Sequence, residues 1–409
     1  MKICFKYLVF PIIGSFLFML SASFASSVPV NLTSISKATS STSPSPARLI
    51  IPPAPQLNAK GYVLMDANSG QILAEKNMNQ RMAPASLTKM MTLYIIANSL
   101  KNKQIAINDK VHISKKAWET GGSKMFVKAG ANVSVKELVQ GIVVQSGNDA
   151  CTAMAEYIAG TEEAFAGLMN QMAYYLGMKD THYTDSTGLP HANHYSTPHD
   201  MAILAQAIIN DFPEYYNSWY KQKWFTYNKI RQPNRNRLLW RDPSVDGLKT
   251  GHTPQAGYCL VASANRNGMR LIAVVMGTHS DEARNAADEA LLNYGFRFFK
   301  TQHLFDANQP ITQARIWLGH QKILNLGVVK NLYVTVPTIE VNKIKAQAHI
   351  DAIIKAPIKQ QQTLGHLSIY VDNRQVQSIP LIALQANPKG GLWTRFIDST
   401  VLLIKKIIP

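Results

Sequence analysis

Three short groups of polar residues have the types and spacing that nucleophilic acyl transfer requires. The first is Ser86-Leu-Thr-Lys89, which follows Pro84 and opens an apolar helical pattern. At the start of a helix this spacing places both side chains on one face, one turn apart. An amine whose pKa is lowered by burial or by a second cation can take the serine proton. The N–H groups at the helix start favour a developing oxyanion. Ser86 is therefore the candidate nucleophile and Lys89 its candidate base.

The Ser-x-x-Lys spacing by itself is weak evidence, because the chain holds two more copies. One is Ser34 to Lys37, in a polar stretch, and the other is Ser218 to Lys221, in an aromatic stretch. At Ser86 a proline precedes the pattern and an apolar helical pattern follows it, and neither of the other copies has this setting. We interpret both copies as accidental.

The second and third groups are Ser146-Gly147-Asn148 and Lys249-Thr250-Gly251. The second falls between two helical patterns, where a loop could project a hydroxyl and an amide into a cleft, although a helix-capping turn has the same composition. The third precedes a strand expected from Gly257, and its lysine and hydroxyl could hold a carboxylate. Taken alone, the third group also fits a surface turn.

Taken together and in this order, the three groups resemble the motif set of the serine penicillin-recognising enzymes. Longer segments extend the likeness to the low-molecular-mass penicillin-binding proteins that are D-alanyl-D-alanine carboxypeptidases of peptidase family S11. These segments are Gly122–Gly130, Gln145–Cys151, Asp185–Pro190, Asn234–Asn236 and Asp246–Thr253. The resemblance covers roughly residues 59–409. It implies an α/β (α+β) catalytic domain of the β-lactamase/transpeptidase-like type, with an antiparallel sheet and a helical lobe. A small all-β domain and an amphipathic C-terminal helix are expected to follow.

The resemblance also implies an activity, the removal of the terminal D-alanine from peptidoglycan stem peptides. Ser86 is then the nucleophile that attacks the penultimate D-alanine and Lys89 is the general base. Ser146 relays a proton to the leaving amine, and Asn148 binds the peptide backbone of the substrate. β-Lactams become covalent inhibitors, because they mimic the scissile carbonyl while their leaving group stays tethered. No cofactor and no metal is implied.

Further roles in the resemblance concern the carboxylate of the substrate and the oxyanion. Lys249 and Thr250 hold the terminal carboxylate with help from Arg284, for which an ordinary surface arginine is the alternative interpretation. The backbone N–H groups of Ser86 and His252 form the oxyanion hole. Supporting roles fall to three more positions of the matching segments, Gly147, Gly251 and Arg235.

Three other functions fit parts of the same pattern. A class A β-lactamase carries Ser-Asp-Asn and a loop glutamate, whereas this chain has Gly147 and no glutamate in a matching setting. A peptidoglycan DD-endopeptidase shares the motifs but usually lacks a β-domain and an anchor. A wall-binding or membrane-binding protein without activity would fit the basic charge, but the catalytic positions are intact. His191, His194 and His199 match no zinc helix spacing, so a polar loop explains them better than a metal site.

Hydrophobic periodicity predicts the elements that position these groups. Residues 61–66 and 71–75 form a predicted hairpin, and helices dominate from residue 86 to about 211. Strands return at 257–262 and 270–276, before a helix at 282–294. Strands that bracket a helical block indicate a sheet in which both ends of the domain meet.

Composition predicts an exported protein with five regions. They are a signal peptide at 1–25, a disordered spacer at 26–58, the catalytic domain at 59–295, a β-rich domain at 296–387 and a membrane-anchoring helix at 388–409. Alternatives are a retained N-terminal anchor and a terminal helix docked on the β-domain.

The net charge of +17 favours anionic lipid or cell wall over nucleic acid, for which no binding motif is present. We therefore expect the periplasmic face of the inner membrane. Cys151 and Cys259 are expected to be inert buried thiols.

Overall fold

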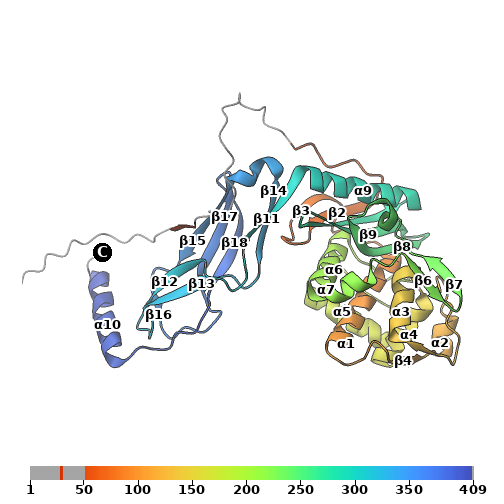
Figure 1. Cartoon of the computed structure of the whole chain (residues 1–409), viewed down its shortest axis with the longest axis horizontal. Coiled ribbons are helices and arrows are strands. Elements are labelled where there is room, and N and C mark those ends of the chain that lie inside the picture. Colours follow the sequence, from red (N-terminus) through yellow and green to blue (C-terminus); the bar gives the residue numbers. More distant parts are fainter. Residues whose placement is uncertain (1–27, 31–50, 408–409) are drawn as a thin grey trace, which may run out of the picture. The chain divides into compact units, whose positions relative to one another are not determined.

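The structure, a computed structural model, describes residues 28–30 and 51–407 (Figure 1). The predicted signal peptide lies outside the described residues. Of the predicted spacer, the structure describes the strand β1 (Val28–Val30) and the segment 51–58. The described residues form two compact units. The first unit contains 51–304 and 332–342, and the second contains 28–30, 305–331 and 343–407.

A five-stranded antiparallel sheet forms the framework of the first unit. Its order is β3-β2-β10-β9-β8, and the strands are β2 (Gly61–Asp66), β3 (Ile72–Lys76), β8 (Val245–Thr253), β9 (Gly257–Arg266) and β10 (Met269–Thr278). The pairing of β2 with β10 joins the two ends of the unit, which confirms the prediction that they meet in one sheet.

The sheet is buried on both faces because its strands are apolar on both sides. Alternate residues of β10 enter two separate cores, with Ile272 and Val274 in one and Leu271 and Ala273 in the other. This alternation follows from the twofold period of a strand. Helix α9 (Asp281–Phe298) covers one face, and helices of the lobe cover the opposite face (Figure 1).

The helical lobe follows β3 and interrupts the sheet. Ser86 lies in a short 3₁₀ turn, η1 (Ala85–Thr88), which leads directly into α1 (Lys89–Lys101). The other helices are α2 (Lys115–Glu119), α3 (Val135–Gln140), the π-helical turn η2 (Gly141–Gln145), α4 (Asn148–Ala159), α5 (Glu162–Leu176), α6 (Pro198–Asp211), α7 (Pro213–Trp219) and α8 (Leu238–Arg241). Two small two-stranded antiparallel sheets, β4 (Lys110–His112) with β5 (Asn132–Ser134) and β6 (Trp224–Tyr227) with β7 (Ile230–Pro233), complete it.

Strand β8 is the main element that the sequence pattern does not predict. Its residues Lys249, Thr250 and Gly251 were expected in a turn ahead of the strand that starts at Gly257. Polar and glycine residues interrupt the apolar alternation of β8, which hides the strand. The surface-turn interpretation is wrong, since all three residues are buried within the edge strand of the sheet.

Apart from its C-terminal helix, the second unit is all-β, as expected. Its sheet has the order β1-β15-β17-β18-β13-β12-β16. The strands after β1 are β12 (Thr312–Trp317), β13 (Ile323–Gly327), β15 (Ile344–Ile350), β16 (Ile354–Lys355), β17 (Thr363–Val371) and β18 (Arg374–Ala383). A separate pair, β11 (Phe299–Phe305) with β14 (Leu332–Pro337), is followed by the short helix η3 (Thr338–Lys343). Apart from Phe305 and Lys343, these three elements belong to the first unit.

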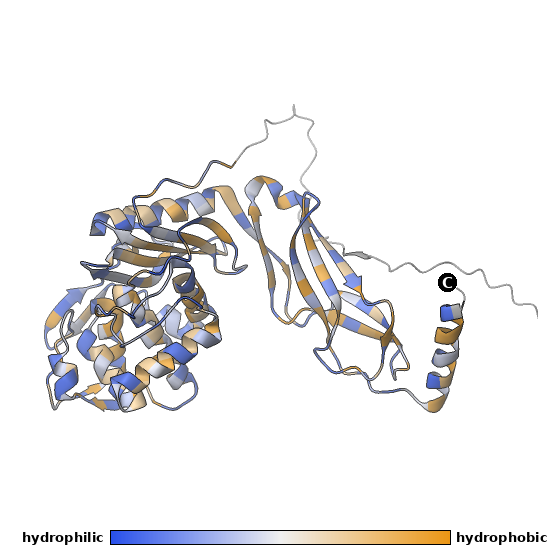
Figure 2. Ribbon diagram, turned by 180° about the vertical axis from the view of Figure 1, so that it is seen from behind, coloured by the Kyte–Doolittle hydropathy of each residue, from blue (hydrophilic) through white to orange (hydrophobic). Residues whose placement is uncertain are grey.

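Helix α10 (Leu392–Ile407) ends the described chain and is amphipathic (Figure 2). On its polar side, Asp398 is buried and accepts a hydrogen bond of 2.7 Å from the Leu318 N–H. On the other side, Trp393 and Phe396 are 79% and 67% exposed. Among the described helices, none has the length and apolarity needed to cross a bilayer. The helix therefore touches the β-domain with one face and leaves an apolar face free.

Candidate active site

Ser86 and Lys89 are joined by a direct hydrogen bond. The distance from Lys89 Nζ to Ser86 Oγ is 2.9 Å, and the same nitrogen donates to the Thr187 carbonyl oxygen at 2.7 Å. Lys89 is completely buried, whereas Ser86 is half-buried and reaches the cavity described below. The predicted Ser-x-x-Lys geometry is confirmed, with the difference that the turn at Ser86 is 3₁₀ rather than α-helical.

The environment of Lys89 favours the neutral amine. The pKa of Lys89 is lowered to about 8, chiefly by burial and to a smaller extent by the cation of Arg235, against the raising effects of nearby acidic groups. An ammonium in an apolar setting loses hydration that the protein does not fully replace. At neutral pH a useful fraction of Lys89 can therefore accept a proton from Ser86.

Ser146 and Lys249 form a second serine–lysine pair. Lys249 Nζ donates to Ser146 Oγ at 3.0 Å and to the Thr250 carbonyl oxygen at 3.0 Å. Ser146 ends η2 in the left-handed conformation, with φ of 61°. Burial, followed by the cations of Lys89 and Arg235, holds the pKa of Lys249 well below its ordinary value. The two pairs share one electropositive site.

Close backbone contact brings β8 against the Ser86 turn. A Cβ atom on Gly251 would lie 2.9 Å from the Pro84 carbonyl oxygen and 3.3 Å from the Leu87 N–H nitrogen. Only a residue without a side chain allows this approach. The contact places the start of η1, which contains Ser86, beside Gly251 and His252. In the resemblance the two oxyanion-hole N–H groups are those of Ser86 and His252.

Asn148 and Asp149 shape the loop opposite β8. The Asn148 amide donates to the Gly121 carbonyl oxygen at 2.6 Å, and its backbone N–H donates to the Ser123 carbonyl oxygen. Asp149 is fully buried and its carboxylate accepts from four backbone N–H groups, those of Met125, Phe126, Val127 and Ala150. Asp149 lies within the segment Gln145–Cys151, but its role was not predicted from the sequence. Its signal was an acidic residue in the first turn of a helix directly after the Ser-Gly-Asn group.

Arg284 and Arg235 bring two further cations to the site. Arg284 is 5% exposed, pairs with Asp281 and donates to the Gly251 carbonyl oxygen at 3.4 Å. The interpretation of Arg284 as an ordinary surface arginine is therefore wrong. Burial lowers the pKa of Arg235, whose segment is tied to the sheet by a 3.0 Å bond from the Asn236 amide to the Gly247 carbonyl oxygen.

A cavity of about 480 Å³ unites these groups. Its walls carry Ser86, Ser146, Thr250, Arg235 and Arg284. A larger cavity of about 850 Å³ lies elsewhere and includes Ser218 of the second Ser-x-x-Lys copy. The Ser218 hydroxyl donates to the Tyr215 carbonyl oxygen instead of meeting a lysine. The chemistry of the walls, rather than the volume, therefore identifies the site. Ser34 and Lys37 lie outside the described residues.

Two contacts of the site involve residues to which no role was assigned from the sequence. The Thr187 carbonyl oxygen is a direct partner of Lys89, and Tyr258 stacks within 5.6 Å of the Arg284 guanidinium. Nearby, Cys151 is buried and free, and burial raises its thiol pKa to about 12. Cys259 is also buried and free. Both cysteines are uncharged packing residues, as expected.

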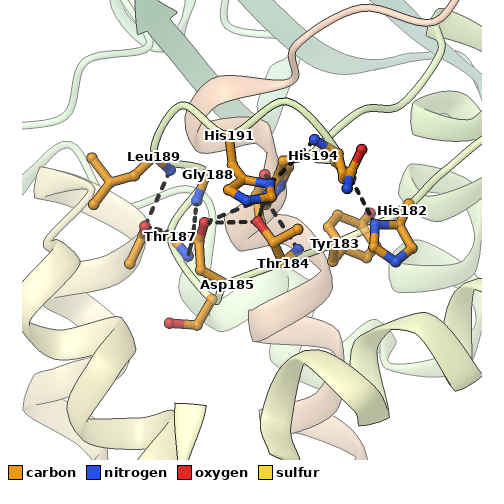
Figure 3. A network of polar contacts seen from close by, with 12 residues as sticks. His182, Tyr183, Thr184, Asp185, Thr187, Gly188, Leu189, His191 and His194 are labelled. Carbon is orange, nitrogen blue, oxygen red and sulfur yellow. Dashed lines mark hydrogen bonds and ion pairs between the residues drawn. The ribbon is translucent and has the colours of Figure 1, made fainter. Parts of the chain in front are cut away.

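The three histidines of the polar loop do not converge. One ring nitrogen of His194 bonds Thr184 (Figure 3), and the other bonds Thr88. His191 accepts from the Asn193 N–H, and His199 lies near Asp200. Within residues 28–30 and 51–407, no group of three or more histidine, cysteine, aspartate or glutamate residues is arranged to hold a metal ion.

Two known protein families match consecutive parts of the chain. The family described as D-alanyl-D-alanine carboxypeptidase matches residues 49–280. The family described as penicillin-binding protein 5, C-terminal domain, matches residues 299–389. The chain is 43% identical over 364 residues to D-alanyl-D-alanine carboxypeptidase DacA of Escherichia coli (strain K12), a match that covers 87% of this chain and 90% of that protein.

Solved structures show the same fold. Penicillin-binding protein 5 from Haemophilus influenzae matches with a TM-score of 0.78 and 41% identity, covering 82% of this chain and 99% of that one. Penicillin-binding protein D2 from Listeria monocytogenes, in its ampicillin-bound form, matches with a TM-score of 0.55 and 27% identity, covering 60% and 100%. Together with the two serines of the cavity and the buried lysines that pair with them, these findings identify the chain as a member of the D-alanyl-D-alanine carboxypeptidase family of penicillin-binding proteins.

Proposed function

We propose that this enzyme removes the terminal D-alanine from peptidoglycan pentapeptide stems through an acyl-enzyme on Ser86. The observation that carries the proposal is the convergence of two buried lysines on two serines in one cavity, with bonds of 2.9 Å and 3.0 Å. Lys89 takes the Ser86 proton as Oγ attacks the penultimate D-alanine carbonyl. Water then hydrolyses the ester, which releases the shortened stem and regenerates the serine.

The other groups of the cavity then have defined roles. Ser146 passes a proton to the departing D-alanine nitrogen, since its hydroxyl already contacts Lys249. Thr250, Lys249 and Arg284 attract the terminal carboxylate, an anion that suits a site with several cations. The N–H groups of Ser86 and His252 stabilise the oxyanion. Asn148 binds the peptide backbone of the stem, and Gly147, Gly251 and Arg235 support the geometry.

β-Lactams are expected to acylate the same serine. The ampicillin-bound relative from Listeria monocytogenes supports this expectation. A β-lactam presents a carbonyl and a carboxylate much as D-alanyl-D-alanine does, but its leaving group remains attached after ring opening. The tethered amine blocks the water that would release the ester, so the adduct is long-lived.

Labelled penicillin and intact-protein mass spectrometry test the nucleophile. The wild-type chain should gain the mass of one penicillin, and S86A should gain none. S218A is the matched control, because it alters the serine of the second Ser-x-x-Lys copy without touching this cavity. The assignment would be refuted if S86A were labelled at the wild-type level, or if labelling were lost in S218A alone.

Product analysis separates this activity from its rivals. Free D-alanine should accumulate from a synthetic pentapeptide stem at a steady rate. Faster cleavage of cross-linked dimers than of pentapeptide would identify a DD-endopeptidase instead, and rapid turnover of penicillin would identify a β-lactamase.

The location that we propose is the periplasmic face of the inner membrane. Residues 1–25 serve as an export signal, residues 26–58 as a spacer, residues 59–295 as the catalytic domain and residues 296–387 as the β-domain. The tail, residues 388–409, lies in the membrane interface. Its exposed Leu392, Trp393, Phe396 and Ile397 and the basic Lys405 and Lys406 support the last assignment.

Single charge insertions into α10 test the membrane contact. F396E adds a carboxylate to the apolar face and should move the protein from vesicles of anionic lipid to the supernatant in a sedimentation assay. F396L, which keeps an apolar side chain at the same exposed position, is the matched control and should stay bound. Equal binding of both variants would contradict the interfacial helix.

A further inference from the structure

The buried His194 connects the two segments that hold Lys89. Its Nε2 lies 2.8 Å from Thr88 Oγ1, one residue before Lys89 in the chain. Its Nδ1 lies 3.0 Å from Thr184 Oγ1 and 3.3 Å from Asp185 Oδ2 (Figure 3). His194 is 4% exposed and Thr88 is fully buried. Water therefore has little access to replace either contact.

Asp185 organises the loop that meets the catalytic lysine. Its Oδ1 accepts three bonds of 2.7 Å, from the Thr187 N–H, the Thr187 hydroxyl and the Gly188 N–H. Burial by itself raises the pKa of Asp185, but hydrogen bonds from His194 and Thr187 outweigh that effect and hold it well below its ordinary value. The carboxylate is thus ionised at neutral pH and holds the loop through charge-assisted bonds.

The loop packs against the Ser86 turn without room for adjustment. Gly188 has φ of +86°, and a Cβ atom there would lie 1.9 Å from the Ala85 carbonyl oxygen. Thr92 on α1 donates to the Ser186 carbonyl oxygen at 2.7 Å. The loop and the start of α1 therefore behave as one packed piece, in which the position of one sets the position of the other.

These contacts close a ring around the base. It runs from His194 to Thr88, along the chain to Lys89, across to the Thr187 carbonyl oxygen, and back through Asp185 to His194. A neutral amine that donates one N–H to the Thr187 carbonyl oxygen can direct its lone pair at Ser86 Oγ. The direction of that lone pair depends on where the loop holds the carbonyl.

We propose that His194 is a positioning residue, which aligns the Lys89 amine with Ser86 by tying Thr88 to the Thr184–Asp185 segment. His194 itself touches neither Ser86 nor the cavity wall. The inference rests on the proposed function, since it assigns to His194 a part in the acylation of Ser86. It predicts that loss of the tie slows acylation and leaves reversible binding intact.

Four variants test the role of His194. H194F keeps a ring of similar size and removes both contacts. H194Q places a polar atom near the Nε2 position and H194N near the Nδ1 position, so each keeps one half of the tie. H191F is the matched control, because His191 lies in the same loop and is exposed. For each protein, stopped-flow mixing with labelled penicillin gives the maximal acylation rate constant and the half-saturating concentration, and thermal melting reports folding.

H194F should acylate about 10- to 100-fold more slowly than the wild type, the loss expected for a misplacement of about 1 Å. Its half-saturating concentration should stay within about twofold. H194Q and H194N should recover part of the rate, and H191F should match the wild type.

Equal acylation rates for H194F and the wild type would overturn the inference. So would parallel losses of rate, binding and melting temperature across all three His194 variants, because a purely structural role predicts that pattern. A wild-type protein that forms no adduct on Ser86 would instead refute the proposed function, and the inference with it.

Discussion

Loss of the positive charge of Arg235 is expected to shift the pH dependence of Ser86 acylation to more alkaline values. In the proposed mechanism Lys89 must be neutral to act as the base, and burial together with the Arg235 cation keeps its pKa at about 8. At that value about a tenth of the amine is neutral at pH 7 and half is neutral at pH 8. Removal of a nearby cation raises the pKa, because the ammonium is then less disfavoured. Loss of the Arg235 charge is therefore expected to slow the acylation of Ser86 near neutral pH.

The size of the effect follows from the same titration. In R235Q, each unit by which the pKa of Lys89 rises lowers the rate at pH 7 about tenfold and leaves the rate near pH 10 unchanged. R235K, which keeps the charge, is the control and should keep the wild-type midpoint. The assay is the acylation rate constant at saturating labelled penicillin from about pH 6 to 10.

Two results for Arg235 would refute the electrostatic reasoning. One is a uniform fall of the rate at every pH with an unchanged midpoint, which would make Arg235 a binding or packing residue. The other is a shift of the midpoint to more acidic pH in R235Q.

Two further perturbations test the framework of the site. G188A forces a Cβ to within 1.9 Å of the Ala85 carbonyl oxygen at φ of +86°. Penicillin labelling and the melting temperature should therefore both fall. The control is G167A, which lies in open space within α5 and should label normally and melt no lower than the wild type. If G188A labels like the wild type, the contact is not needed. D149N replaces a carboxylate that accepts from four backbone N–H groups, so urea unfolding should show a loss of about 2–4 kcal/mol. A loss below about 0.5 kcal/mol would show that the loop does not depend on Asp149.

Much of the fold was predictable because it depends on apolar periodicity. The hairpin at 61–76, the strands β9 and β10 and helix α9 all have strong alternation or helical spacing, and the structure confirms them. Strand β8 was not predictable in the same way. Polar and glycine residues of this strand belong to the site rather than the core, so the sequence of β8 lacks the apolar alternation of a strand. Its strand conformation depends on pairing with the neighbouring strand β9.

The sequence by itself determined which residues to propose for the site, since the order and type of its motif residues sufficed to nominate Ser86, Lys89, Ser146 and Lys249. Tertiary structure alone decided which groups act on them. Lys89 meets the Thr187 carbonyl oxygen, 98 residues away in the chain, and Lys249 meets Ser146 across 103 residues. Such contacts have no local signature, because they arise when separate elements pack together. The lowered pKa of Lys89 is likewise a product of burial, which a linear sequence does not contain.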